Sequence, residues 1–157
     1  MTTILMTGAT SGLGLEVARN LAAVGADLVV GARNPEKADD LKAVVPASQL
    51  TLLPLDLASL ASVRTLAEAV KDHSFDAVAL NAGLQFTGPQ PLTADGVCNS
   101  FATNHLGHFL LAHLLLPQMA QAAWWSPLVR APITRMKSWP ICLAFAAGCF
   151  PPLRGWR

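Results

Sequence analysis

A glycine-rich turn is the first part of this sequence whose residue types could do chemistry. Residues 7–14 read TGATSGLG, after an apolar run and before a segment whose apolar residues recur at helical spacing. Glycines in such a turn permit positive φ angles and the close approach of a ligand, and the N-terminus of the following helix attracts anions. The turn therefore favours binding of a pyrophosphate. Because glycine-rich turns also occur for packing alone, residues at other positions must decide whether this turn binds a pyrophosphate.

A second candidate position lies at the end of the next apolar run, where a dinucleotide site contacts the adenosine ribose. The chain has Ala32, Arg33 and Asn34 there. A carboxylate at this place would bind the ribose 2′-hydroxyl and favour NAD. Since these three positions hold no carboxylate, and Arg33 could pair with a 2′-phosphate through two hydrogen bonds, we expect NADP as the cofactor, with NAD the lesser candidate. The alternative is a surface arginine at a strand end.

Three histidines, His105, His108 and His113, lie within one apolar helical segment. Imidazole is a common metal ligand, usually in company with cysteine, carboxylate or further histidine ligands. No Asp or Glu follows Asp95. We therefore expect packed or exposed helical roles for these histidines, and we expect no metal.

The elements that must position these residues alternate along the chain. Apolar runs at residues 2–6, 27–32, 50–55 and 76–80 predict strands, and apolar residues at helical spacing predict helices at 13–24, from 35, at 59–72 and at 97–116. Pro35 suits a first helical turn and Ser59 suits a helix cap. Strands that alternate with helices form parallel sheets covered on both faces. The sequence therefore predicts an α/β fold: a Rossmann-like, doubly wound parallel sheet of about four strands.

The composition changes along the chain. Residues 1–95 have six basic and ten acidic residues, net −4, whereas residues 96–157 have five basic residues and no acidic residue, net +5. All four tryptophans and five of the eleven prolines follow residue 118. We therefore divide the chain into a partial nucleotide-binding domain, residues 1–118, and an irregular tail, residues 119–157. The uncharged stretch 138–153 is shorter than the roughly 20 apolar residues of a membrane span, so membrane association is not expected.

The overall composition limits the possible partners. With 52% hydrophobic residues, 13% charged residues and a net charge of +1, the chain is unlike a disordered protein or a nucleic-acid-binding protein with a basic face. A small molecule is the expected partner. The three cysteines show no pairing pattern, and no signal peptide precedes the first strand, so we expect a cytoplasmic chain.

Four motifs follow one another in a familiar order: the glycine-rich turn, Asp56 and Leu57 after the third predicted strand, Asn81 to Gly83 after the fourth, and NHLGHFLL at residues 104–111. The chain resembles the short-chain dehydrogenase/reductase family, above all the branch of retinol dehydrogenases and protochlorophyllide reductases. The resemblance implies Asn104 as a catalytic residue. It also implies cofactor contacts from Thr7, Gly8, Ser11, Gly12, Leu13, Gly14, Arg33, Asn34, Asp56, Leu57, Asn81, Ala82 and Gly83.

The other catalytic residues of that family are not found in this sequence. The family uses a serine after the fifth strand, a tyrosine that exchanges a proton, and a lysine four residues beyond the tyrosine. This chain has no tyrosine, and Lys137 has Ile133 four residues before it. The resemblance therefore implies an NADP-dependent oxidoreductase of carbonyl or alcohol groups by descent, inactive in this chain. A non-catalytic NADP-binding or interaction module and an unstable gene remnant stay open as alternatives.

Residues 122–128 read AAWWSPL where the family's fifth strand is due. That strand commonly has several Val or Ile followed by two serines. Tryptophan has a single codon, so Trp124 and Trp125 fix the bases at this point. Read from the third base of each codon, the segment is compatible with RVVVSS. We hypothesise a frameshift near residues 119–121, so that the chain is truncated as a family member. The fourth strand would then be a sheet edge, open to self-association or aggregation.

Overall fold

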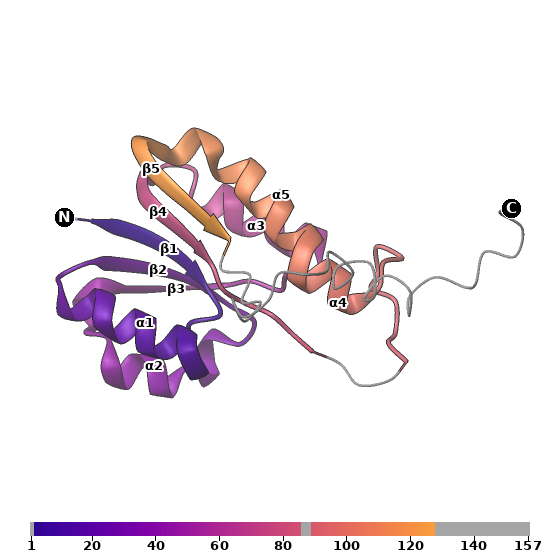
Figure 1. The fold of residues 1–157 in the computed structure, drawn as a ribbon, viewed down its shortest axis with the longest axis horizontal. Helices are drawn as coiled ribbons and strands as arrows, with labels where there is room; N and C mark the ends of the chain where they lie inside the picture. Colours follow the sequence, from indigo (N-terminus) through magenta and orange to yellow (C-terminus); the bar gives the residue numbers. More distant parts are fainter. Residues whose placement is uncertain (1, 86–88, 128–157) are drawn as a thin grey trace, which may run out of the picture.

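The computed structural model describes residues 2–85 and 89–127, with residues 120–127 described as backbone only. Their strands form one parallel sheet of order β3-β2-β1-β4-β5 (Figure 1). The strands are β1 (Thr3–Thr7), β2 (Asp27–Ala32), β3 (Leu50–Pro54), β4 (Phe75–Leu80) and β5 (Met119–Pro127). The chain winds outward from β1 to β3 and then returns to the other side of β1. The strand order therefore reverses between β1 and β4.

Helices cover both faces of the sheet (Figure 1). They are α1 (Gly12–Ala23), α2 (Asp39–Val44), α3 (Leu60–Ala69), α4 (Asn99–Phe101) and α5 (Gly107–Leu115), with a π-helical segment, Ala102–Leu106, joining α4 to α5. Short 3₁₀ turns occur at Pro35–Lys37, Ala47–Gln49 and Leu116–Gln118. α1 and α2 lie on one face, and α3 and α5 lie on the other. This arrangement confirms the predicted Rossmann-like, doubly wound α/β class.

Alternation along β1 builds a separate core under each layer of helices. Leu5 packs in the cluster with α3 and α5, whereas Ile4 and Met6 pack in the cluster with α1 and α2. Successive side chains of a strand point to opposite faces of a sheet, so a strand covered on both faces is apolar throughout. This is why Ile4, Leu5 and Met6 form an uninterrupted apolar run before the glycine-rich turn.

Most element boundaries agree with the sequence prediction, and one helix start differs. Ser59 caps α3 as expected, because its hydroxyl accepts a hydrogen bond from the Ser62 N–H. Pro35, by contrast, opens only a 3₁₀ turn, and α2 begins at Asp39. The predicted helix at 97–116 is found as α4, the π-helical segment and α5 in succession.

The sheet has five strands, one more than the about four that the sequence predicts. β5 pairs in parallel with β4 in the register Ala77 with Trp124 and Val78 with Trp125, with a bulge near Phe75. The irregular segment predicted from residue 119 is therefore a strand over Met119–Pro127, and β4 is an inner strand. A strand edge offers backbone N–H and C=O groups that any extended segment can pair with, so pairing does not require an alternating side-chain pattern. The rest of the predicted tail, residues 128–157, lies outside the described residues.

Two features are absent from the described part of the chain. No helix there is long and apolar enough to cross a membrane. The same residues contain no group of three or more His, Cys, Asp or Glu side chains arranged to hold a metal ion.

Candidate functional site

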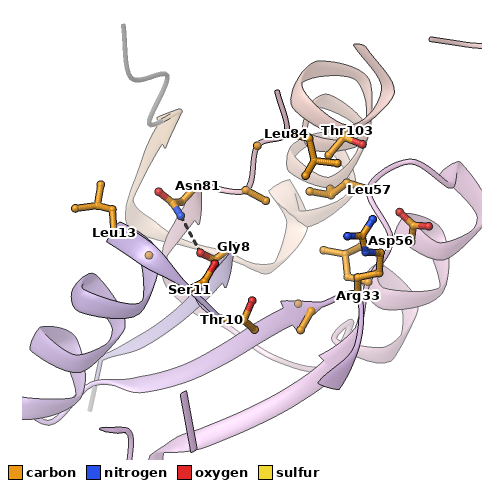
Figure 2. A pocket seen from close by; sticks show the side chains of 16 residues that line it. Gly8, Thr10, Ser11, Leu13, Arg33, Asp56, Leu57, Asn81, Leu84 and Thr103 are labelled. Carbon is orange, nitrogen blue, oxygen red and sulfur yellow. Dashed lines mark hydrogen bonds between the residues drawn. The ribbon is translucent and has the colours of Figure 1, made fainter. Parts of the chain in front are cut away.

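A cleft of about 450 Å³ opens at the carboxyl ends of β1, β2 and β4 (Figure 2). Ligands of open α/β sheets bind at this edge, where the strand order reverses and neighbouring loops diverge. The loops after β1, β2, β3 and β4 and the start of the long helix contribute its walls. The lining residues are Gly8, Thr10, Ser11, Leu13, Gly14, Gly31, Ala32, Arg33, Leu55, Asp56, Leu57, Asn81, Ala82, Gly83, Leu84 and Thr103.

The glycines of the turn after β1 meet two different requirements. A Cβ on Gly14 would collide with the Gly8 carbonyl oxygen, and a Cβ on Gly8 would lie 2.6 Å from the Ala82 Cα. Gly12 has a φ of +56° and open space where a Cβ would stand. Gly8 and Gly14 therefore allow close packing of the turn, and Gly8, with a φ of +68°, shares with Gly12 the left-handed backbone that favours glycine.

The helix α1 presents its N-terminus to this cleft. Ser11 occupies the cap position, but its side chain makes no capping hydrogen bond, and the first turn contains no acidic residue. The first N–H groups of a helix have no partners within it and carry partial positive charge. Because Ser11, Leu13 and Gly14 all line the cleft, these N–H groups are placed to bind an anionic ligand. A dinucleotide's pyrophosphate therefore fits the residues present.

Arg33 and Asp56 are the charged residues among those that line the cleft. They project from the loops after two neighbouring strands, β2 and β3 (Figure 2). The local turn fixes Asp56: its Oδ1 accepts a hydrogen bond from the Ala58 N–H at 2.9 Å, and its own N–H donates to Ser62 Oγ at 2.9 Å. Arg33 is exposed. The cleft thus has one held carboxylate and one exposed guanidinium at the end distant from α1's first turn.

The floor of the cleft is tied to the end of β1. The buried Thr7 Oγ1 accepts hydrogen bonds from the backbone N–H groups of Asn81 and Ala82, each at 3.1 Å. The Asn81 Nδ2 in turn donates to the Gly8 carbonyl oxygen at 3.0 Å (Figure 2). Two side chains therefore hold the loop after β4 against the glycine-rich turn, although these segments lie more than 70 positions apart in the chain.

Asn104 uses its whole side-chain amide to hold a neighbouring loop. Its Oδ1 accepts from the Leu84 N–H at 2.7 Å, and its Nδ2 donates to the Leu84 carbonyl oxygen at 2.8 Å. Leu84 lines the cleft, whereas Asn104 does not. The amide of Asn104 therefore shapes the cleft through Leu84.

The helix is locally wider around Asn104. Over Ala102–Leu106 it is π-helical, and the Gly107 N–H donates to the Ala102 carbonyl oxygen five positions earlier. A Cβ on Gly107 would collide with the Leu57 carbonyl oxygen. Close approach of the loop after β3 therefore requires glycine at this point, and single π turns of this kind are frequent at functional sites.

His108 is a buried member of the same region. Its Nε2 lies 3.0 Å from Thr7 Oγ1, and its Nδ1 lies 3.5 Å from the Asn104 carbonyl oxygen. Burial lowers the pKa of this imidazole below its ordinary value, the hydrogen bond to the Asn104 backbone opposes that shift, and the nearby His105 adds to it. His105 and His113 are exposed on the helix.

Most of the sequence-predicted cofactor residues meet at this cleft. Those that line it are Gly8, Ser11, Leu13, Gly14, Arg33, Asp56, Leu57, Asn81, Ala82 and Gly83. Thr7 lies buried beneath the floor. Gly12, Asn34 and Asn104 are not among the lining residues. Sequence reasoning missed Thr10, Gly31, Leu55, Leu84 and Thr103, which adjoin or lie within segments that had been identified and could have been found by extending them.

Comparison with known proteins now identifies the family. The family model for short chain dehydrogenases matches residues 2–124, from the start of the sheet into β5. The chain belongs to the short-chain dehydrogenase family. Protochlorophyllide reductases and retinol dehydrogenases are among its relatives, which confirms the branch expected from the sequence.

One such relative is the short-chain dehydrogenase TIC 32 B, chloroplastic, of Brassica napus. It is 42% identical over 132 residues, which cover 77% of this chain and 39% of the relative. The chain therefore spans about two fifths of the length of that short-chain dehydrogenase.

Solved structures of this family agree with the fold. An uncharacterised protein of Mycobacterium paratuberculosis matches with a TM-score of 0.69 and 39% identity, over 76% of this chain and 43% of that one. A structure described as a Pseudomonas aeruginosa RhlG/NADP active-site complex matches with a TM-score of 0.63 and 27% identity, over 78% of this chain and 50% of that one.

Proposed function

We propose that this short-chain dehydrogenase chain binds NADP(H) in its cleft, in preference to NAD(H). The observation that carries the proposal is the charge at the end of the cleft that would hold the ribose. Arg33 lines the cleft directly after β2, and its neighbours Ala32 and Asn34 are not acidic. A guanidinium pairs with a phosphate through two charge-assisted hydrogen bonds, whereas a carboxylate there would repel it. The family uses nicotinamide dinucleotides, and the RhlG structure supports NADP for one relative.

The other lining residues suit the remaining parts of a dinucleotide. The first turn of α1, with Ser11, Gly12 and Leu13, would hold the pyrophosphate, and the Thr10 hydroxyl is available beside it. Asp56 and Leu57 would contact the adenine. Asn34, at the end of β2, and the floor residues Asn81, Ala82 and Gly83 would lie along the adenosine. The cofactor supplies hydride exchange with carbonyl or alcohol groups; this chain's residues bind and orient it.

We propose further that this chain by itself does not turn over a substrate. It has no tyrosine to exchange the proton, and Asn104 is the one family catalytic position that it retains. We thus propose that the chain descends from an oxidoreductase that acted on a small carbonyl or alcohol compound and that it has lost this activity. A cytoplasmic location is part of the same proposal. The chain would then serve as a non-catalytic NADP-binding module, and the formed cleft favours this alternative over an unstable gene remnant.

Titration of the purified 157-residue chain with NADPH, followed by nicotinamide fluorescence, tests the proposal. We expect saturable binding, weaker binding of NADH, and about tenfold weaker NADPH binding in Arg33→Ala, because a lost charge-assisted hydrogen bond contributes about 1.5–3 kcal/mol. Arg19→Ala removes an exposed arginine paired with Glu16 and is the matched control. A folded chain that binds neither nucleotide would contradict the proposal and favour the remnant. Turnover of any carbonyl substrate would show a complete enzyme.

A further inference from the structure

The hydroxyl of Thr7 has three polar neighbours, and their chemistry fixes its proton. The backbone N–H groups of Asn81 and Ala82 donate to Oγ1 at 3.1 Å each, and the Nε2 of His108 lies 3.0 Å away. A hydroxyl group has one proton to donate and accepts through two lone pairs. Both lone pairs are used by backbone N–H groups that can only donate. The hydroxyl proton must therefore be donated to His108 Nε2.

This assignment determines the form of the imidazole. Since Nε2 accepts, it carries no proton, and a neutral ring then carries its proton on Nδ1. The Nδ1 faces the Asn104 carbonyl oxygen at 3.5 Å, which is the side on which an acceptor is available. A doubly protonated ring would place an N–H against an oxygen whose lone pairs are both occupied. It would also leave the Thr7 hydroxyl proton without an acceptor in a buried position.

We propose that His108 is a positioning residue of the cofactor cleft: its neutral Nδ1–H form fixes the Thr7 hydroxyl that holds the cleft floor, and its protonation loosens that floor and weakens dinucleotide binding. The binding half of this inference rests on the proposed function. His108 touches neither the cleft nor a substrate and acts through Thr7, Asn81 and Ala82.

The charged and titratable surroundings of His108 are few. Thr7 on β1 and Asn104 in the π-helical segment do not titrate. His105, on the same helical run, is the neighbour whose charge acts on the ring, in the direction that lowers the pKa of His108. α3 packs against α5, and its charged side chains, Arg64 and Glu68, are exposed. Because burial lowers the pKa of His108, the neutral form persists to more acidic pH in the folded chain than in a free imidazole.

The first test reads the ring directly and needs no cofactor. Long-range ¹H–¹⁵N NMR of the full chain with labelled histidine distinguishes protonated from unprotonated ring nitrogens, and the missing signals of His108→Gln assign the ring. At neutral pH we expect an unprotonated Nε2 and a protonated Nδ1. A proton on Nε2 would overturn the inference, whether or not the chain binds a nucleotide.

The second test measures NADP⁺ affinity by calorimetry from about pH 8 to about pH 5 in three forms of the full chain. The NADP⁺ affinity of the wild-type chain should fall about tenfold for each pH unit below the folded pKa of His108, because binding then competes with the uptake of one proton. His108→Gln should lack this decline, since its amide oxygen can accept the Thr7 hydroxyl and does not titrate. His113→Gln, which changes an exposed histidine of the same helix, should behave as wild type.

The ratio of wild-type to His108→Gln affinity is the quantity to compare, since the 2′-phosphate also takes up a proton near pH 6 and affects both. Equal pH profiles for these two chains would overturn the coupling. His108→Leu removes the acceptor and should bind about tenfold more weakly than His108→Gln at every pH. Absence of NADP⁺ binding by wild type at every pH would remove the proposed function and the coupling, whereas the nitrogen resonances would still decide the form of the ring.

Discussion

Asn104 and Leu84 are joined by a reciprocal pair of hydrogen bonds, in which the amide side chain mimics a strand partner for the Leu84 backbone. The Leu84 N–H donates to Oδ1 at 2.7 Å, and Nδ2 donates to the Leu84 carbonyl at 2.8 Å. The pair joins the loop after β4 to the π-helical segment. Both groups of the amide are thereby used, so this side chain holds the cleft wall in place.

Replacing Asn104 by Asp tests this clamp. The carboxylate can accept from the Leu84 N–H but cannot donate to the carbonyl, and it faces that oxygen unfavourably. We expect a loss of about 1 kcal/mol in the free energy of unfolding, measured with urea, since the site is exposed. His105→Ala, a change at the neighbouring exposed position, is the control. An Asn104→Asp chain as stable as wild type would show that the pair contributes nothing.

Gly107→Ala tests the close approach of the helix to the loop after β3. An added Cβ would meet the Leu57 carbonyl oxygen, which is backbone and cannot move aside cheaply. We expect a destabilisation of about 1–3 kcal/mol by urea unfolding, typical of overpacking. Elsewhere in an α-helix the same change usually stabilises, so the sign of the effect is diagnostic. A Gly107→Ala chain more stable than wild type would show that the helix leaves room for a Cβ beside the Leu57 carbonyl oxygen.

Ser59→Ala tests the helix cap that the sequence predicted. The variant leaves the Ser62 N–H without its acceptor, and we expect the free energy of unfolding to fall by about 1 kcal/mol. Ser48→Ala, at an exposed position before β3, should leave the stability unchanged. If the two variants unfold at the same urea concentration, the hydroxyl of Ser59 does not cap α3.

His108 also predicts how stability depends on pH. Its folded pKa lies below that of the unfolded chain, so the unfolded chain binds more protons in the interval between the two. The contribution of His108 is therefore complete above the ordinary value of 6.5 and is lost as the pH falls toward the folded pKa. Urea unfolding at several pH values should show a decline in wild type that is smaller in His108→Gln. An identical decline in both chains would contradict this assignment.

The frameshift hypothesis predicts a property of the gene. The bases that encode residues 122–128, read one frame over, should give several valines followed by serines and should continue as an open frame. Sequencing the gene and restoring that frame with a single-base change near residues 119–121 would check this. A stop codon directly after the segment in the shifted frame would end the hypothesis. β5 lies at this point of the chain, so the restored segment would take the same place beside β4.

Short-range sequence patterns determined many of the strands, caps and turns of this protein. The apolar runs at residues 27–32 and 76–80, the cap at Ser59 and the glycine-rich turn depend on neighbours a few positions away, and the structure confirms each as a strand, a cap or a turn. The position of Arg33 after β2 follows from the same order. Local periodicity and steric preference carry enough information for these features.

Only the tertiary structure decided the contacts between segments that are distant in the chain. The bonds of His108 to Thr7 and of Asn104 to Leu84 join positions 101 and 20 residues apart, and no local pattern encodes them. β5 also escaped prediction, because its pairing depends on an edge that β4 provides rather than on its own side chains. Parallel strands bring their carboxyl ends to one edge, so residues distant in the chain become neighbours only when the sheet has formed.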